Sequence, residues 1–317
     1  MNTMAKLLLA MLAKDITHLS EKHQLLPVHH FGGHPGRSTT DSLHLLVDTI
    51  KVEWRRKQVV LVLFLDIEGV FLNVVTSRLL HNLRRWRIPE EYMIFIENML
   101  MGRRNRLKFD IYMSDWFQLD NGIVQGDLLS MVLYLFYNAD MLDVAQGWNE
   151  MCLGYIDDMA LVASGHTLQD THWVLGSILM REGGVNSWSQ WSASHHSTLE
   201  PLKSVLVDFS RSKTVERPNM QVQGVVVQLQ EAHKFLGVIL DQELRWQQQV
   251  EGAIVTCYAR RRLGPGFGFG LGWVWVRVWG SNRLGFSKWV AAPTRLSCPG
   301  FSHEWRASHE ERRQDKG

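Results

Sequence analysis

The sequence has few of the residues that build cross-linked, zinc-bound or membrane-spanning proteins. Its 317 residues include three cysteines, Cys152, Cys257 and Cys298, none in a CxxC spacing. This argues against a disulfide partner or a cysteine-rich zinc site and indicates a reducing compartment. No run reaches the roughly 18 apolar residues of a membrane helix, so we expect no membrane partner. Charge is also close to balanced, with 34 basic and 32 acidic residues, and by itself predicts no partner.

The chain nevertheless has enough apolar residues for a core, and its composition changes near residue 258. It is 45% apolar and 21% charged, and its length predicts roughly two domains. Residues 258–317 hold eleven basic and four acidic residues, nine of the 25 glycines and five of the 13 tryptophans. This tail has a net charge of +7, and the remainder −5. Two interpretations stay open, a basic aromatic nucleic-acid surface or an aberrant, disordered translated segment; we favour the second.

Leu7–Ala13 resembles the apolar core of a signal peptide, but only one lysine precedes it and Lys14-Asp15 follows at once. Apolar residues at helical spacing over 3–24 favour a helix packed on the body instead. We therefore expect an intracellular protein, nuclear or cytoplasmic, that is not secreted.

Hydrophobic periodicity and turn residues predict alternating helices and strands. Val59–Asp66 reads as a strand buried on both faces, and Ser38 to Asp41 supply an N-cap for a helix through Arg56. Further helices are predicted over 76–101 (broken at Ile88-Pro89), 127–143, 168–190 and 243–258, and strands over 106–112, 116–119, 152–156, 159–163, 204–209, 222–229 and 234–240. This order favours an α+β fold with helices on one face of a mixed sheet.

Three carboxylates at strand ends are the strongest chemical signal. Asp157 and Asp158 join two short apolar strands, and a two-residue Asp-Asp turn is a poor choice unless both carboxylates are needed. A plain hairpin is about as good a reading of this pair alone. Asp66 ends the most apolar strand, where an unpaired carboxylate is unfavourable. Together the three would suit Mg²⁺, and two such ions about 3.5–4 Å apart can clamp both oxygens of an in-line phosphoryl displacement.

Six segments in register resemble reverse transcriptases, in particular the polymerase domain of a non-LTR (LINE-type) retrotransposon. Three of them, in chain order, are Phe64–Phe71, Asn121–Ser130 and Tyr155–Asp158. The others are Gly36–Asp41 in the fingers, Lys203–Phe209 as the fourth motif and His233–Val238 as a primer-grip-like fifth. The resemblance runs from about Leu7 to Val250.

The resemblance implies a right-hand polymerase with a ferredoxin-like palm, partial fingers and a truncated thumb. The implied domains are partial fingers at 1–57, the palm at 58–240, the start of the thumb at 241–257 and the aberrant tail at 258–317.

The resemblance also implies roles for individual residues. The catalytic and metal-binding set is Asp66, Asp157 and Asp158 with the Ile67 carbonyl, holding two Mg²⁺ or Mn²⁺ ions. The nucleotide- and template-binding set is Arg37, Phe71, Gln125, Gly126 and Lys203, and the primer-grip-like set is Phe235, Leu236 and Gly237. Phe71 holds the bulky position that crowds a 2′-hydroxyl. Without the resemblance, Phe71 reads equally well as a core residue. A turn would then be the better reading of Gln125-Gly126, and a solvated surface charge the better reading of Arg37 and of Lys203.

The sequence departs from the family pattern at three positions. Ile156 stands where alanine or valine is usual, and Leu128 and Met131 replace two prolines. We expect the helix that follows Asp127 to survive with a less rigid loop. The pairs His29-His30 and His195-His196 lack metal-ligand spacing and are interpreted as surface histidines.

These observations predict an RNA-directed DNA polymerase that adds deoxynucleotides to a primer 3′-hydroxyl by two-metal catalysis. Its partners would be dNTPs, an RNA or DNA template and a primer. Two alternatives remain, a decayed remnant with at most weak nucleic-acid binding, and another palm enzyme such as a nucleotide cyclase.

Overall fold

The computed structural model describes most of the chain and divides it into two compact units. The described residues are 3–67, 69–180, 188–198, 200, 203–210, 219–222, 225–262, 275–278 and 288–291. The first unit runs from Met1 to Trp246 and the second from Gln247 to Gly317. Each is described by itself.

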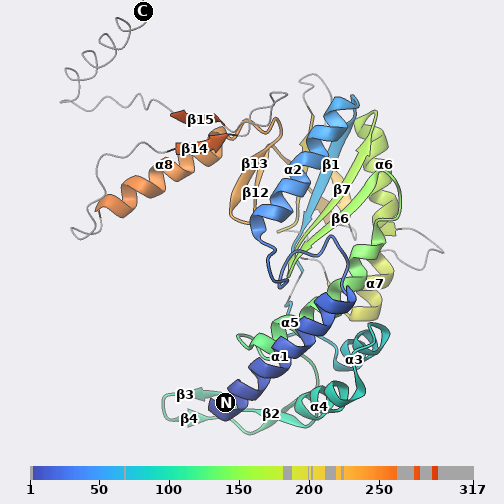
Figure 1. Ribbon diagram of the computed structural model, residues 1–317, viewed down its shortest axis with the longest axis vertical. Coiled ribbons are helices and arrows are strands. Elements are labelled where there is room, and N and C mark those ends of the chain that lie inside the picture. The colour runs from blue at the N-terminus through green and yellow to red at the C-terminus, as the bar shows by residue number, and fades with distance from the viewer. Residues whose placement is uncertain are drawn as a thin grey trace, which may run out of the picture. The chain divides into compact units, whose positions relative to one another are not determined.

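A five-stranded sheet forms the centre of the first unit (Figure 1). Its strands are β1 (Val59–Leu65), β6 (Glu150–Tyr155), β7 (Asp158–Gly165), β8 (Val205–Phe209) and β11 (Leu229–Gln230), in the order β11-β8-β1-β7-β6. β1 runs antiparallel to both β7 and β8, and β11 lies parallel to β8. The order β8-β1-β7-β6 is that of a ferredoxin-like βαββαβ unit. This confirms the predicted palm.

Helices cover both faces of this sheet, so the expectation of helices on one face was wrong. Leu61, Leu63 and Leu65 pack with α6 (Leu168–Met180) and α7 (Trp188–His195). The alternate residues Val60, Val62 and Phe64 pack with α2 (Thr39–Arg55) and with the hairpin of β12 (Ala232–Phe235) and β13 (Val238–Asp241). The reason lies in β1, because a strand without a polar side chain on either face needs cover on both.

A helical layer lies below the end of the sheet and holds a second apolar core. It consists of α1 (Thr3–His23), α3 (Thr76–Arg85), α4 (Glu90–Leu100) and α5 (Leu128–Asn138), followed by the 3-10 helix η1 (Ala139–Val144). α1 packs through Leu9, Ala13 and Ile16, which confirms a helix packed on the body. The predicted break between α3 and α4 is confirmed too, since α4 begins directly after Pro89.

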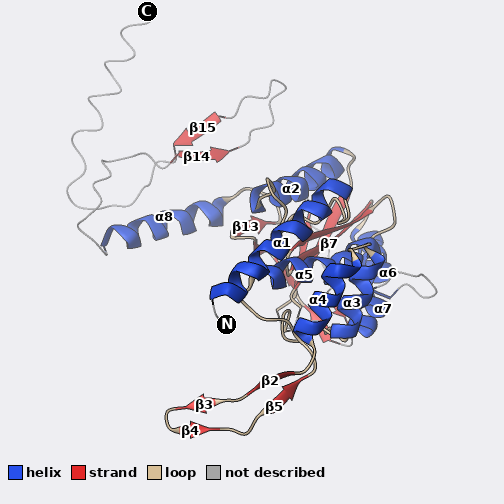
Figure 2. Ribbon diagram, turned by 60° about the horizontal axis from the view of Figure 1, so that its bottom comes forward, coloured by secondary structure: helices blue, strands red, loops and turns tan. Residues whose placement is uncertain are grey.

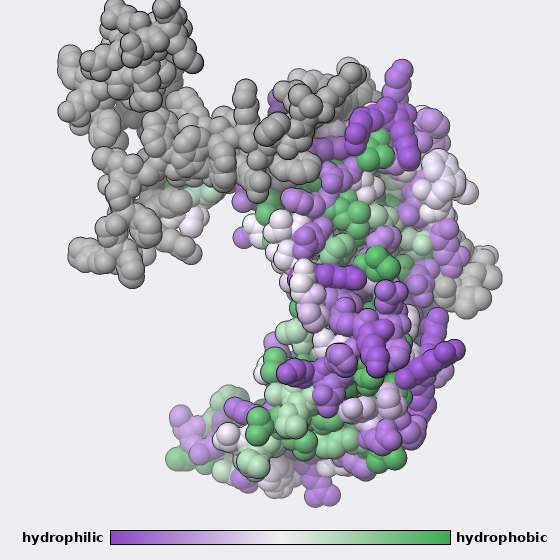
Figure 3. All heavy atoms as spheres, viewed as in Figure 1, coloured by the Kyte–Doolittle hydropathy of each residue, from purple (hydrophilic) through white to green (hydrophobic). Residues whose placement is uncertain are grey.

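A two-part hairpin arm projects from this layer (Figure 2). β2 (Arg103–Asn105) pairs with β5 (Phe117–Leu119), and β3 (Lys108–Phe109) pairs with β4 (Tyr112–Met113). The prediction of one strand over 106–112 was therefore wrong, because the chain reverses between Phe109 and Tyr112. The arm and α1 expose several large apolar side chains, and hydrophobic surface is visible at this end of the unit (Figure 3).

The remaining elements are short or lie in the second unit. β9 (Met220–Val222) and β10 (Val225–Val227) pair with each other, so the strand predicted over 222–229 is divided among β9, β10 and β11. The helix predicted over 168–190 is described as α6 and α7, with 181–187 outside the described residues. The second unit holds α8 (Gln247–Arg262) and the antiparallel pair β14 (Trp275–Val278) and β15 (Lys288–Ala291). Most of the predicted tail lies outside the described residues, and the domain limits stay predictions.

No described helix combines the length and the hydropathy that a bilayer crossing requires.

Two histidines predicted to lie on the surface are buried. His30 and His195 both expose 0% of their surface. His30 reaches the Asn138 side chain, with 3.2 Å between Nε2 and Oδ1. His195 stacks on Trp191 with 4.4 Å between ring centroids and lies 3.4 Å from the Asp140 carboxylate. Asn138 and Asp140 come from distant parts of the chain, so local spacing could not reveal these two contacts.

Candidate active site

The turn between β6 and β7 lies one residue earlier than expected and contains only the first aspartate of the pair. Tyr155 pairs with Asp158 in the β6–β7 register, so Ile156 and Asp157 form the two-residue loop. Asp158 is therefore the first residue of β7, not part of the turn. Both aspartates are nevertheless exposed.

Asp66 lies directly after β1, the strand beside β7, and contacts Lys203. Leu65 pairs with Met159, which places the end of β1 next to the start of β7. Lys203 Nζ lies 3.4 Å from Asp66 Oδ2 and 3.1 Å from Glu200 Oε2. The Glu200 carboxylate and then Asp66 raise the pKa of Lys203. The Glu200 N–H donates to the Asp66 carbonyl at 2.9 Å, which fixes this segment beside the strand end.

The three aspartates form one electrostatic cluster. Although the Asp158 side chain reaches solvent, its pKa is raised to about 6, first by partial burial and then by the charges of Asp157 and Asp66. Within the described residues, no three histidine, cysteine, aspartate or glutamate side chains lie close enough together to hold a metal ion unaided. The oxygen ligands still fit Mg²⁺, which usually binds through one or two carboxylates plus water and substrate phosphates. Ile67 is buried next to Asp66.

Phe71 lies in the region of the Asp157 charge and beside the Asn121–Ser130 segment. Its ring packs on Tyr134 with 5.4 Å between centroids. Burial and then the Asp157 charge raise the pKa of Tyr134, so Phe71, Tyr134 and Asp157 share one region. The Phe71 carbonyl accepts the Ile123 N–H at 2.7 Å. Phe71 is half-buried, so it is packed on a core and also reaches the surface.

The loop before α5 presents Gln125 and Gly126 to solvent. Gly126 has a φ of +89°, and a Cβ placed there would meet nothing within 4 Å. α5 begins at Leu128, and the Asp127 side chain caps it by accepting the Leu129 N–H at 3.3 Å. The expectation that the helix survives without its prolines is thereby confirmed.

Arg37 lies on the loop before α2 and makes hydrogen bonds within that loop. Its Nη1 donates to the carbonyls of Val28 and His30, both at 2.8 Å. Its guanidinium lies 5.8 Å from the Phe31 ring centroid. The structure therefore places Arg37 as a support of the 28–31 segment, while its contact with substrate phosphates stays a prediction.

The primer-grip-like residues form the tip of the β12–β13 hairpin. Leu236 and Gly237 have φ values of +47° and +85°, as a two-residue type I′ turn needs. Phe235 is buried and packs on Phe64 with 4.9 Å between centroids. Since Phe64 precedes Asp66 by two residues, this hairpin is anchored to the strand that carries Asp66.

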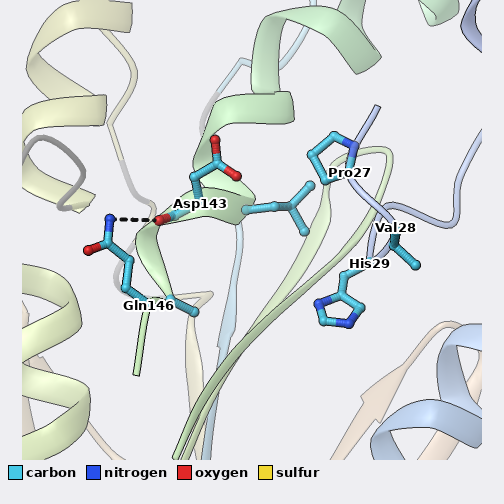
Figure 4. Close-up of a pocket in the computed structure, with 7 residues that line it drawn as sticks. Pro27, Val28, His29, Asp143 and Gln146 are labelled. Carbon is cyan, nitrogen blue, oxygen red and sulfur yellow. Dashed lines mark hydrogen bonds between the residues drawn. The ribbon is translucent and has the colours of Figure 1, made fainter. Parts of the chain in front are cut away.

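The structure also holds a cavity of about 410 Å³ between the 27–29 loop and η1 (Figure 4). Pro27, Val28, His29, Leu142, Asp143, Ala145 and Gln146 line it. None of the three aspartates does.

Sequence reasoning missed the residues that support the aspartate turn. Ile156 adopts a φ of +59°, and Asn138, Gly32 and His30 contact this region from two other segments. The Gly32-Gly33 pair was the one local signal of a close approach. A Cβ on Gly32 would come within 2.6 Å of the Ile156 nitrogen.

The buried histidines predict a loss of stability in mild acid. Burial lowers the pKa of His30 to about 4, and burial likewise lowers the pKa of His195 to about 4. Below pH of about 6.5 the unfolded chain binds protons at these residues that the folded chain does not, so stability falls as pH falls from 6.5 to 4. Asp158 acts in the opposite direction below pH 6, but two histidines outweigh one aspartate.

We therefore expect the melting temperature at pH 5 to lie several degrees below that at pH 7.5. His195→Gln should flatten this dependence, whereas His18→Gln, at an exposed position, should leave it unchanged. Equal melting temperatures of the unsubstituted protein at both pH values would contradict the assignment.

A palm-type sheet with carboxylates after its central strand and in its neighbouring hairpin is typical of right-hand polymerases. The family model for reverse transcriptase (RNA-dependent DNA polymerase) matches residues 1–240. The chain belongs to the reverse transcriptase family.

Relatives from mobile elements support the same assignment. A probable RNA-directed DNA polymerase from transposon X-element of Drosophila melanogaster is 26% identical over 250 residues, covering 78% of this chain and 27% of that protein. The RNA-directed DNA polymerase from mobile element jockey of Drosophila melanogaster is 23% identical, covering 75% and 25%. These relatives confirm the resemblance to retrotransposon reverse transcriptases. The chain spans about a quarter of the length of these relatives.

A solved structure of apo telomerase from Candida tropicalis is also similar in part. It has a TM-score of 0.49 at 10% identity and covers 75% of this chain and 39% of that chain.

Proposed function

We propose that this chain carries the catalytic part of an RNA-directed DNA polymerase that adds deoxynucleotides to a primer 3′-hydroxyl. The observation that carries the proposal is the convergence of Asp66, Asp157 and Asp158, from β1 and the β6–β7 hairpin, into one cluster beside Lys203. Asp66 and Lys203 lie far from the aspartate pair in the sequence. Family membership favours this activity over the nucleotide cyclase alternative.

Asp66, Asp157 and Asp158, with the Ile67 carbonyl, would hold two Mg²⁺ or Mn²⁺ ions. When bound, these ions would neutralise phosphate charge and lower the pKa of the attacking hydroxyl. Lys203 carries a positive charge beside Asp66 and is suited to the pyrophosphate leaving group.

The surrounding residues would position the nucleotide, the template and the primer. Catalysis of phosphoryl transfer depends mainly on such positioning and on electrostatic stabilisation. The exposed Gln125-Gly126 loop would contact the incoming nucleotide and the template, and Phe71 its sugar. Arg37 would meet substrate phosphates. The hairpin with Phe235, Leu236 and Gly237 would hold the primer end.

Metal removal tests this proposal. With an RNA template, a DNA primer and dNTPs, the 317-residue chain should extend the primer in Mg²⁺ or Mn²⁺. Extension should stop with excess chelator and return when metal is restored, because carboxylates alone cannot neutralise phosphate charge.

A parallel reaction on a DNA template would show the template preference. Binding of the primer–template without extension in either metal would overturn the proposal in favour of the decayed remnant.

A further inference from the structure

The aspartate turn contains a backbone conformation that its own sequence disfavours. Ile156, the first of the two loop residues, has a φ of +59°. Glycine is the usual residue at such positions in two-residue hairpins, because a β-branched side chain clashes with the backbone there. Such strain persists only where the surrounding structure enforces it, and it is frequent at functional sites.

Asn138 supplies a direct restraint on this residue. It is the last residue of α5, is fully buried, and donates from Nδ2 to the Ile156 carbonyl at 2.5 Å. Its Oδ1 faces His30 Nε2 at 3.2 Å. Burial lowers the pKa of His30 to about 4, so the imidazole is neutral near pH 7 and can donate from Nε2. The Asn138 amide is thereby oriented with its nitrogen toward Ile156.

The segment that carries His30 is itself fixed to β6. The Phe31 N–H donates to the Gly154 carbonyl at 2.8 Å, and the Gly154 N–H donates to the His29 carbonyl at 3.1 Å. Gly32 then lies against Ile156, where a side chain would not fit. Two distant segments therefore meet at the residue that precedes Asp157 (Figure 1 shows β6 and β7 converging above α5).

We propose that Asn138, oriented by His30, is a positioning residue that holds Ile156 in its left-handed conformation and so places the Asp157 carboxylate. This inference rests on the proposed function, since it assigns how the catalytic turn of that same site is held. A purely structural buried asparagine would instead stabilise the fold without regard to the conformation of Ile156.

A double-substitution cycle separates the two roles, because glycine takes a positive φ without strain. Asn138→Ala is compared in the unsubstituted protein and in the Ile156→Gly background. In the first, we expect kcat for single-nucleotide addition to fall by about tenfold or more with KM for dNTP nearly unchanged, as small misplacements do. In the Ile156→Gly background the same substitution should lower kcat by less than about threefold.

Asn82→Ala is the matched control. Asn82 is also fully buried and donates to the carbonyls of Phe136 and Tyr137, which precede Asn138 on α5, and it makes no described hydrogen bond to Ile156. Whatever Asn82→Ala does to kcat and melting temperature, we expect the same effect in both backgrounds. An equal loss of kcat from Asn138→Ala in both backgrounds would overturn the proposal.

Melting temperatures of the same proteins keep this test separate from the proposed function. Asn138→Ala should lower the melting temperature less in the Ile156→Gly background than in the unsubstituted protein. If the unsubstituted chain extends no primer, the proposed function fails, while coupled melting shifts still support the restraint. Additive shifts would refute it.

Discussion

Asp157→Asn is expected to abolish primer extension, by about a thousandfold or more, while the protein still folds. The substitution removes a carboxylate ligand, and metal-assisted charge stabilisation contributes several kcal/mol to such reactions. Asp157 is exposed, and its charge raises the pKa of Asp158. Removing a like charge from this cluster should therefore leave the melting temperature unchanged or slightly raised.

Asp115→Asn is a suitable control, because Asp115 is an exposed aspartate on the hairpin arm. It should change neither activity nor melting temperature. Full extension by the Asp157→Asn protein would remove Asp157 from the site, and a lowered melting temperature would show that the carboxylate stabilises the fold.

Phe71→Val should weaken the preference for deoxynucleotides over ribonucleotides by about 10- to 100-fold. Phe71 is half-buried on Tyr134, in the region of the Asp157 charge, where a bulky ring can crowd a 2′-hydroxyl. Steric discrimination of this size is typical of one pocket contact. The measurement is kcat/KM for a dNTP and for the matching ribonucleotide on one primer–template.

Leu72→Ala, at an exposed neighbouring residue, is the control and should keep the original preference. If Phe71→Val loses stability yet keeps its preference for deoxynucleotides, Phe71 is only a core residue.

The strands next to the three aspartates could be predicted because their signals are local. A seven-residue apolar run defined β1 and made Asp66 stand out, and two apolar runs around Asp157 defined the hairpin. The contact between Lys203 and Asp66 was not predicted, because it joins segments that are far apart in the sequence. The roles of these residues, and those of Arg37, Gln125 and the β12–β13 tip, stay predictions.

The support of the turn could not be predicted, because it depends on long-range contacts. His30 and Asn138 are 108 residues apart, and no pattern in either segment shows that they meet. The two adjacent aspartates predicted a turn at Asp157-Asp158, whereas the strand register places the turn at Ile156-Asp157. Ile156 is a poor choice for a positive φ on local propensity, so only tertiary contacts explain it.

The most direct test of the account is single-turnover addition of one nucleotide to a primer on an RNA template. The primer 3′-oxygen should bond to the α-phosphorus, with one pyrophosphate released per nucleotide and the hydroxyl proton lost. The account predicts that only the complementary dNTP reacts, only with Mg²⁺ or Mn²⁺, and not in the Asp157→Asn protein. Addition that ignores the template base, or that is equally fast in the Asp157→Asn protein, would contradict it.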